Sequence, residues 1–193
     1  MKVCALIALA GRESPEFCFL HDSPEGFHSK RRRLTQGEPA GDDFPSDARI
    51  PMSDEESGIV VPDVVGNNRG FLIVSARLAQ AIEPLALPVE VLPVSILNHK
   101  GRVASKDHFV LNPLGSHDCL DLAASEIKYL EGDVVEVKKY VFAPSKLKTL
   151  PHMFRVKEWP RTIVLADDVL KAWLTLDPEP TNLVIETAEI SPR

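Results

Sequence analysis

The sequence has 193 residues, with 22 Lys and Arg against 28 Asp and Glu, which gives a formal net charge of −6. A chain of this length can bury about 70% of the surface that it exposes when unfolded, which is enough for a folded domain. The acidic excess argues against a dedicated nucleic-acid binder, because such proteins neutralise phosphates with clustered Lys and Arg. The 16 Pro and 10 Gly are typical of a globular protein with many turns. We expect one domain over residues 1–193.

The N-terminal residues and the cysteines indicate a soluble cytoplasmic protein without membrane insertion. Val3 to Ala10 form an apolar run that is too short to span a bilayer, and we interpret it as a buried first strand closed by Gly11. The three cysteines, Cys4, Cys18 and Cys119, are an odd number and include no CxxC pair. Neither a disulfide framework nor a thiolate zinc site is therefore expected, and we predict no metal and no cofactor.

Negative charge is concentrated in residues 34–63. This segment has eight acids and one base, Arg49, for a net charge of −7, whereas the rest of the chain sums to +1. Four Pro and three Gly interrupt any helical or strand period, so we predict a long loop that is either functional or locally disordered. The basic cluster that precedes it, Lys30 to Arg33, is too short for a nucleic-acid or membrane patch and lacks interleaved aromatic residues. We interpret it as a solvated turn that pairs with the acids after it.

Two strand-helix units follow, 91 residues apart. Phe71 to Val74 is an apolar run typical of a buried strand, and Ser75 is the predicted N-cap of a helix that ends before Pro84. Thr162 to Leu165 repeats this pattern, with Asp167 as the predicted N-cap of a second helix. Each helix is too short to be stable alone and must pack on a sheet. The similarity is one of pattern, so a duplicated unit remains one interpretation.

The intervening residues are predicted to be mostly β. The expected strands are rich in Val, Ile and Phe and are separated by turn residues; they cover 89–97, 107–111, 134–142 and 152–156, with a closing strand at 183–185. Val135 and Val137 alternate with polar residues, which favours a strand with one face in water. The predicted class is α+β, with a mainly antiparallel sheet, two short strand-capped helices and a long loop region rich in Pro, Gly and acids near the N-terminus.

The densest polar cluster spans Asn112 to Asp121, with Ser125 just beyond it. Its His, Asp and Cys residues suggest either a metal site or a Cys/His nucleophile. A zinc site needs converging ligands, whereas the adjacent residues His117 and Asp118 would point apart on a strand. The alternative is structural: Asp118 and Asp121 bond to backbone amides in a turn, while Cys119 and Leu120 pack inside. We predict no catalytic residue and no metal ligand.

Arg155 is the other candidate for recognition chemistry. Its guanidinium could clamp a carboxylate through two parallel hydrogen bonds, or it could form a structural ion pair with an acid of residues 34–63, which we favour. The sequence contains no Walker loop, GxGxxG, HExxH or GxSxG motif. Residue patterns alone therefore predict an α+β domain that is not an enzyme.

Five segments in order resemble a bacterial family of immunity proteins of the myxobacterial type, which was first described as a domain of unknown function. The segments are Gly37-Glu38-Pro39, Gly70 to Leu78, Phe109 to Asn112, Asp118 to Asp121 with Ser125, and His152 to Glu158. The resemblance covers about Leu34 to the C-terminus, leaving residues 1–33 as an unmatched N-terminal strand region before the acidic segment, 34–63, and the core, 64–193. Where the family closes with a Thr-Gly-Leu turn, this chain has Thr181-Asn182-Leu183, and Asn also tolerates a left-handed backbone.

The resemblance implies a cytoplasmic protein that binds a cognate toxin, encoded by the adjacent gene and delivered by type VI secretion or as a polymorphic toxin. Occlusion of the toxin would protect the producing cell and its kin. For a basic toxin, the acidic segment is the expected contact, through Asp42, Asp43, Asp54, Glu55 and Glu56. The shared motif residues are expected to be structural: Asn112, Asp118, Asp121, Ser125, His152, Phe154 and Arg155. The alternatives are a general protein-interaction module without a toxin partner and a small metal- or Cys/His-dependent hydrolase.

Overall fold

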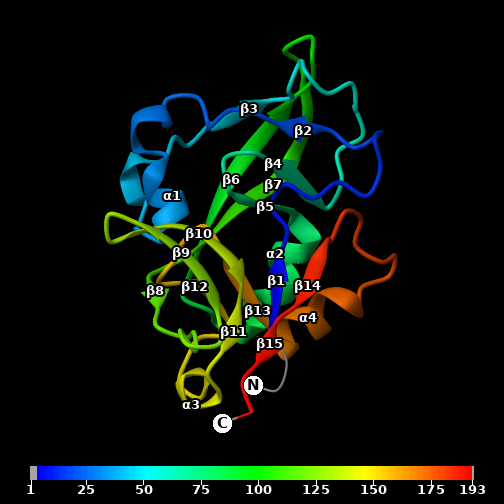
Figure 1. Cartoon of the computed structure of the whole chain (residues 1–193). Coiled ribbons are helices and arrows are strands. Elements are labelled where there is room, and N and C mark those ends of the chain that lie inside the picture. Colours follow the sequence, from blue (N-terminus) through cyan, green and yellow to red (C-terminus); the bar gives the residue numbers. More distant parts are fainter. Residues whose placement is uncertain (1–3, 193) are drawn as a thin grey trace.

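Two β-sheets of six and five strands form the framework of the computed structural model, which describes residues 4–192 (Figure 1). Most strand pairings are antiparallel, and helices α2 (Ala76–Ile82) and α4 (Asp167–Leu174) pack against the sheets. The predicted α+β class is therefore confirmed.

The longest strands of the six-stranded sheet form the β6–β7 hairpin, which reaches the top of Figure 1. In order across the sheet, its strands are β2 (Phe19–Leu20), β4 (Val64–Asn67), β5 (Leu72–Ser75), β7 (Val103–Pro113), β6 (Val89–Leu97) and β3 (Arg49–Pro51). The two outer pairings, β2 with β4 and β3 with β6, are parallel. The predicted strand at 89–97 matches β6, and the one at 107–111 is part of the longer β7.

The five-stranded sheet brings the start of the chain together with its last third. Its order is β14 (Ile185–Thr187), β1 (Cys4–Ile7), β13 (Ile163–Ala166), β12 (Met153–Val156) and β8 (Ser116–His117). The predicted first strand is thus a central strand, although Val3 lies outside the described residues. Two further pairs complete the β structure: β9 (Glu126–Leu130) with β10 (Asp133–Lys139), and β11 (Val141–Phe142) with β15 (Glu189–Ile190). Register shifts interrupt the alternation predicted in β10, where Val135 is exposed.

The helical segments are short. The α-helices are α1 (Arg32–Gln36), α2 (Ala76–Ile82), α3 (Pro144–Leu147) and α4 (Asp167–Leu174), and the 3-10 turns are η1 (His28–Lys30), η2 (Gly41–Asp43) and η3 (Glu83–Leu85). Ser75 occupies the predicted N-cap position of α2, but its hydroxyl donates to Asp63 instead of accepting from the helix. The predicted N-cap at Asp167 is wrong, because α4 begins at Asp167 and its N-cap is Ala166. Asp167 and Asp168 lie in the first turn, where negative charge interacts favourably with the positive end of the helix dipole.

Both faces of β5 and β13 are buried, which explains their continuous apolar runs. In β5, Leu72 and Val74 face a central cluster shared with α2, α4 and the five-stranded sheet, whereas Ile73 faces a second cluster. In β13, Ile163 and Leu165 face the central cluster, and Val164 faces a third cluster. Trp173 of α4 is fully buried and donates its Nε1–H to the carbonyl of Leu78 in α2 at 2.9 Å.

The acidic segment is more ordered than its composition predicts. Most of residues 34–63 lies outside regular helix and strand, but Arg49–Pro51 forms β3, parallel to β6. Leu34, Phe44 and Ile50 are buried in the second cluster, beneath the six-stranded sheet. The segment is thus mostly loop, and spaced apolar side chains secure it to the sheet.

Candidate functional site

The acids of residues 34–63 lie in two separate groups. Asp42 and Asp43 are in η2, which is secured where the backbone N–H groups of Ala40 and Gly41 donate to the carboxylate of Glu90 at 2.9 and 3.0 Å. Asp54, Glu55 and Glu56 lie beyond the opposite end of β6, where Asp54 Oδ1 is 3.5 Å from Nδ1 of His99. A strand rises about 3.3 Å per residue, so the length of β6 separates the two groups by roughly 20 Å or more.

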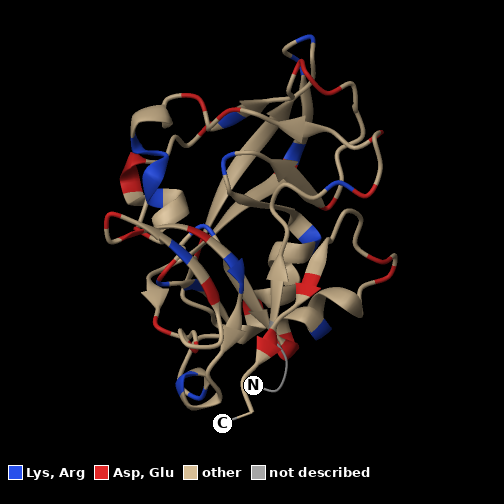
Figure 2. Ribbon diagram, in the orientation of Figure 1, with Lys and Arg blue, Asp and Glu red and all other residues tan. Residues whose placement is uncertain are grey.

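Several of these acids are paired with cations. Asp43 accepts hydrogen bonds from Lys30 and, at 2.7 Å, from Arg33, and the bond from Lys30 holds its pKa below the usual range. The predicted pairing of the basic cluster with the acids after it is confirmed, and the cluster forms η1 and the start of α1 instead of a turn (Figure 2). Glu56 is paired with Arg12 at 2.6 Å.

The other three predicted contact acids are exposed. The Asp54 side chain is 92% exposed and that of Glu55 is 79% exposed, although Glu55 Oε2 lies 3.4 Å from Nδ1 of His21. Asp42 is also exposed, and its side chain has no ion-pair partner among residues 4–192. The local charge is therefore partly neutralised, and Asp42, Asp54 and Glu55 are the acids most open to another molecule.

Arg155 is fully buried and makes no ion pair with a carboxylate in the described part of the chain. Its guanidinium donates to the carbonyl oxygens of Leu34 at 2.6 Å, Pro160 at 2.7 Å and Pro113 at 3.1 Å. The predicted ion pair with an acid of residues 34–63 is therefore wrong: the segment contributes the backbone carbonyl of Leu34 instead. Burial lowers the pKa of Arg155 to about 10, so the side chain remains charged at neutral pH.

Asn112 links this arginine to the carboxylate of Glu90 through hydrogen bonds. Its Oδ1 accepts from Arg155 at 3.4 Å, while its Nδ2 donates to the Glu90 carboxylate at 2.8 Å and to the carbonyl of Glu38 at 2.9 Å. Because Glu90 also secures η2, one buried network connects β12, β7, β6 and the acidic segment. Sequence reasoning identified two members of this network, Asn112 and Arg155, but missed Glu90, which resembles any exposed residue of a strand.

The backbone conformation and surroundings of Gly37 require glycine, which is the first residue of the Gly37-Glu38-Pro39 motif. Its φ of +71° is in the left-handed region, and a Cβ at this position would lie 2.7 Å from the carbonyl oxygen of Gly115. The two backbones also bond directly, from the N–H of Gly115 to the carbonyl of Gly37 at 2.8 Å. Any larger residue would separate the acidic segment from the end of β7.

The cluster from Asp118 to Ser125 is a structural turn beside β11. Asp121 Oδ1 accepts from the backbone N–H groups of Ala123 and Ala124 at 3.2 and 3.3 Å, as predicted, and Cys119 and Leu120 are fully buried. Asp118 differs from the prediction, because it pairs with Lys146 of α3 at 2.7 Å instead of with backbone amides. Ser125 bonds to both the N–H and the carbonyl of Val141 through its hydroxyl.

The remaining motif residues lie on β12 or beside it. Phe154 is fully buried and packs edge-on against the rings of His117 and Phe142. His152, at the exposed start of the strand, bonds through Nδ1 to the carboxylate of Asp168 in the first turn of α4. These contacts connect the five-stranded sheet to its neighbours.

Residues 4–192 contain no group of three or more His, Cys, Asp or Glu side chains placed to hold a metal ion. The other chemistry considered, a Cys/His nucleophile, would use Cys119, whose side chain is closed off from solvent. Cys18, the other thiol whose burial the structure describes, has its pKa raised to about 12 by burial, so it stays protonated at neutral pH. Neither Cys119 nor Cys18 is therefore placed to act as a solvent-accessible thiolate.

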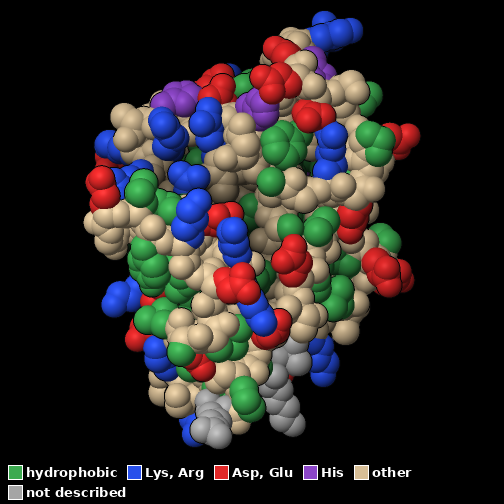
Figure 3. Space-filling view, in the orientation of Figure 1, with side chains coloured by type: hydrophobic (Ala, Val, Ile, Leu, Met, Phe, Trp, Pro, Cys, Tyr) green, Lys and Arg blue, Asp and Glu red, His purple; other side chains and the backbone are tan. Residues whose placement is uncertain are grey.

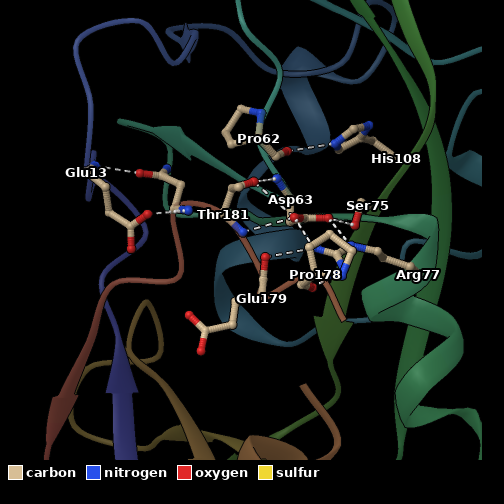
Figure 4. Close-up of polar contacts among 10 residues, drawn as sticks. Glu13, Pro62, Asp63, Ser75, Arg77, His108, Pro178, Glu179 and Thr181 are labelled. Atoms are coloured by element: carbon tan, nitrogen blue, oxygen red, sulfur yellow. Dashed lines mark hydrogen bonds and ion pairs between the residues drawn. The ribbon is translucent and has the colours of Figure 1, made fainter. Parts of the chain in front are cut away.

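A second polar network, missed from sequence, surrounds Asp63 (Figure 4). Its carboxylate accepts from Nε and Nη2 of Arg77 at 2.7 and 2.6 Å, from the hydroxyl of Ser75 at 2.6 Å, and from the backbone N–H and hydroxyl of Thr181, both at 2.9 Å. Burial alone would raise the pKa of Asp63, but these hydrogen bonds outweigh it and hold the pKa well below its usual range.

Arg77 extends this network to the residues before the last strands. It donates to the carbonyls of Pro178 at 2.5 Å and Glu179 at 3.1 Å, so Asp63 and Arg77 together secure residues 178–181 against β4 and α2. Asp63 and Thr181 are 118 residues apart, and no local pattern indicates that they meet.

Asn182 continues this contact into the turn where the resembled family carries glycine. Its φ is +61°, so the prediction that Asn adopts a left-handed backbone here is confirmed. Its side chain also donates to the carbonyls of Gly11 and Val64 and accepts from the N–H of Glu13, bonds that glycine could not make.

Comparison with known proteins identifies the family. None of the described helices is long and apolar enough to cross a membrane. No curated protein matches the sequence significantly. The model of the Immunity protein family (Imm11) matches residues 15–189, which begins well before Leu34, the start of the resemblance found by motif, and includes both the acidic segment and the buried Arg155 network. The chain therefore belongs to the Imm11 family of immunity proteins.

Proposed function

We propose that this protein binds one cognate toxin in the cytoplasm and blocks it by occlusion. The observation that supports this function is the family match over residues 15–189. In this proposal the toxin is encoded by the adjacent gene and is a polymorphic toxin or one delivered by type VI secretion. The protein protects the producing cell and its kin by covering the toxin's active surface, at the cost of a stoichiometric amount of inhibitor.

Binding without catalysis fits the placement of the reactive side chains. Asp118 and Asp121 are engaged in structural bonds, Cys119 is buried, and the cysteine at position 18 is held as a thiol. A partner interface of standard size buries about 1,600 Å² in total, and its affinity depends on a few central anchors with complementary charge around them.

Co-expression tests the proposed function directly. A strain that expresses the product of the adjacent gene should stop growing, and co-expression of this protein should restore growth. An unrelated immunity protein at the same level serves as the control and should give no protection. Growth arrest that this protein does not relieve would contradict the proposal.

The acidic surface, defined as Asp42, Asp43, Asp54, Glu55 and Glu56, is the proposed contact with a basic toxin. Its two groups should be tested separately, because the length of β6 lies between them. Asp54→Asn, Glu55→Gln and Glu56→Gln together should slow association by about tenfold at low salt, since exposed interfacial charges act mainly on the association rate. The double variant Asp42→Asn with Asp43→Asn tests the other group.

Surface plasmon resonance at several salt concentrations measures this effect. A matched control removes the exposed charges of Asp133 and Glu136 on β10, where the protein carries acids outside the proposed surface. The control should keep the wild-type association rate and salt dependence. If both acidic groups can be neutralised without any change in rate, the acidic surface is not part of the interface.

A further inference from the structure

A basic cleft lies where three separate segments of the chain meet. It has a volume of about 500 Å³ and lies between η1 and α1, the β4–β5 turn and the β12–β13 turn. Its lining includes four arginines, Arg31 and Arg32 from the first segment, Arg69 from the second and Arg161 from the third. None of its lining residues is acidic.

This concentration of arginine is unusual within the molecule. Residues 4–192 include ten arginines, and four of them line this single cleft. Arg31, Arg32 and Arg161 form no ion pair with any described carboxylate, whereas Arg12, Arg33, Arg49 and Arg77 elsewhere each do. Like charges that outnumber nearby counter-charges repel one another, and a bound anion relieves that repulsion.

Arg69 retains unused donor capacity at the same place. Its Nη2 lies 3.6 Å from Asp22, which is too long for a good hydrogen bond, and its buried Nε has no acceptor among the described residues. The Arg69 side chain is 38% exposed, so the outer part of its guanidinium is open to a bound group. Arg31 donates from Nη1 to the carbonyl of His28 at 2.9 Å. A guanidinium has five N–H donors, so others remain for a ligand.

We propose that this cleft binds an acidic segment of a partner polypeptide through its carboxylates. Arginine recognises planar carboxylates through two parallel hydrogen bonds, and it is enriched among the residues that dominate interface affinity. The hydroxyl of Ser29 and the amides of Gln36 and Asn68 supply additional donors in the cleft. This inference goes beyond the proposed function, for which the acidic surface is the proposed contact.

The surroundings of the cleft favour a polypeptide over a nucleic acid. Single-stranded nucleic acids need exposed aromatic rings for stacking, and the one aromatic ring of Phe, Tyr or Trp in the lining, Phe71, is 1% exposed. A phosphate backbone also needs a continuous basic track, whereas Asp22 and Asp43 stand beside the cationic residues here. On the face in Figure 3, Lys and Arg gather around α1 with acidic side chains among them.

The position of the cleft also relates it to the acidic surface. Lys30 and Arg33, next to the lining residues Arg31 and Arg32, pair with Asp43 of that surface. A single partner that carries neighbouring basic and acidic segments could therefore contact both sites.

Fluorescence anisotropy with a fluorescein-labelled octaglutamate peptide tests the inference without any toxin. Wild-type protein should bind the peptide at about 0.01 M ionic strength and more weakly at about 0.15 M, because the Debye length falls from about 30 Å to about 8 Å. The double variant Arg32→Ala with Arg161→Ala should bind about tenfold more weakly, since each exposed pair contributes a modest amount. Both side chains are exposed, and circular dichroism verifies the fold.

Matched variants and a second probe make the result decisive. Lys100→Ala with Arg102→Ala removes two exposed charges at the tip of the β6–β7 hairpin and should leave the peptide affinity within about twofold. Arg32→Gln with Arg161→Gln repeats the test with polar replacements. The inference is overturned if octaglutamate does not bind, if both cleft variants bind like wild type, or if labelled (dT)8 binds as tightly and loses affinity in parallel. Because no toxin is used, either result leaves the proposed function to be judged by co-expression.

Discussion

Replacing Arg155 with methionine should remove about 3–5 kcal/mol from the free energy of unfolding, which is a large part of the 5–15 kcal/mol typical of a domain. Methionine keeps much of the side-chain volume but leaves the buried carbonyls of Leu34, Pro113 and Pro160 without their donor. Each buried group that loses its partner costs about 1–3 kcal/mol. Urea unfolding followed by circular dichroism measures the change.

Lys157→Met is the matched control, because Lys157 is exposed and lies next to the same strand. Its unfolding free energy should remain within about 0.5 kcal/mol of wild type. An Arg155→Met variant that keeps the wild-type free energy of unfolding is physically possible, because burying a charge is costly and replacing it with an apolar side chain can be neutral. An Arg155→Met variant as stable as wild type would mean that the hydrogen bonds do no more than offset the cost of burying the guanidinium.

Asp63→Asn should lower the free energy of unfolding by about 2–4 kcal/mol at neutral pH, because an amide cannot accept from all of Arg77, Ser75 and Thr181 and places its own donors against them. The same residue should make wild-type stability depend on acidity. Its native pKa is below the unfolded value of about 3.9, so its contribution is fully present above about pH 4 and is lost as the pH falls further toward the native pKa.

Urea unfolding at a series of pH values between 7 and 3 separates this contribution from that of the other carboxylates. Wild type should lose more stability than Asp63→Asn does over the acidic end of the series. Asp47→Asn is the control, since Asp47 is exposed and pairs only with Arg49 at 3.3 Å. Parallel pH curves for wild type and Asp63→Asn would contradict the assigned role.

The strands and helices that sequence patterns predict well are those buried on both faces. The apolar runs before α2 and α4 are such strands, within one or two residues of their predicted bounds. Residues 89–97 also form β6 as predicted, although much of that strand is partly exposed. Such runs have to be sheltered on both sides, so their position in the chain determines their structure. The closing strand is shifted from 183–185 to Ile185–Thr187, because Asn182 uses its left-handed backbone to turn the chain first.

The pairings between distant segments could not be predicted from local patterns. β3 has three residues, one of which is proline, and it forms a strand only because β6 offers an edge and the second core cluster takes up Ile50. The two-sheet arrangement depends on β1 entering between β13 and β14, a contact between the two ends of the chain.

The networks that organise the site were predictable only in part. Asn112 and Arg155 stand out by type, but a buried guanidinium satisfied by carbonyls looks the same in sequence as one that forms an ion pair. Glu90, Asp63 and Thr181 carry no local signal, since their partners lie 12 to 118 residues away. The charge of −7 in residues 34–63 follows from the sequence, whereas its partial neutralisation by Arg12, Lys30, Arg33 and Arg77 depends on the folded structure.

Titration of the purified toxin with this protein tests the central proposal most directly. The toxin is the product of the adjacent gene, and its residual activity is measured after each addition. Occlusion predicts that activity falls in proportion to the protein added and reaches zero near one molar equivalent. Activity that persists in excess protein, or that disappears at a small fraction of an equivalent as an enzyme would cause, would contradict it.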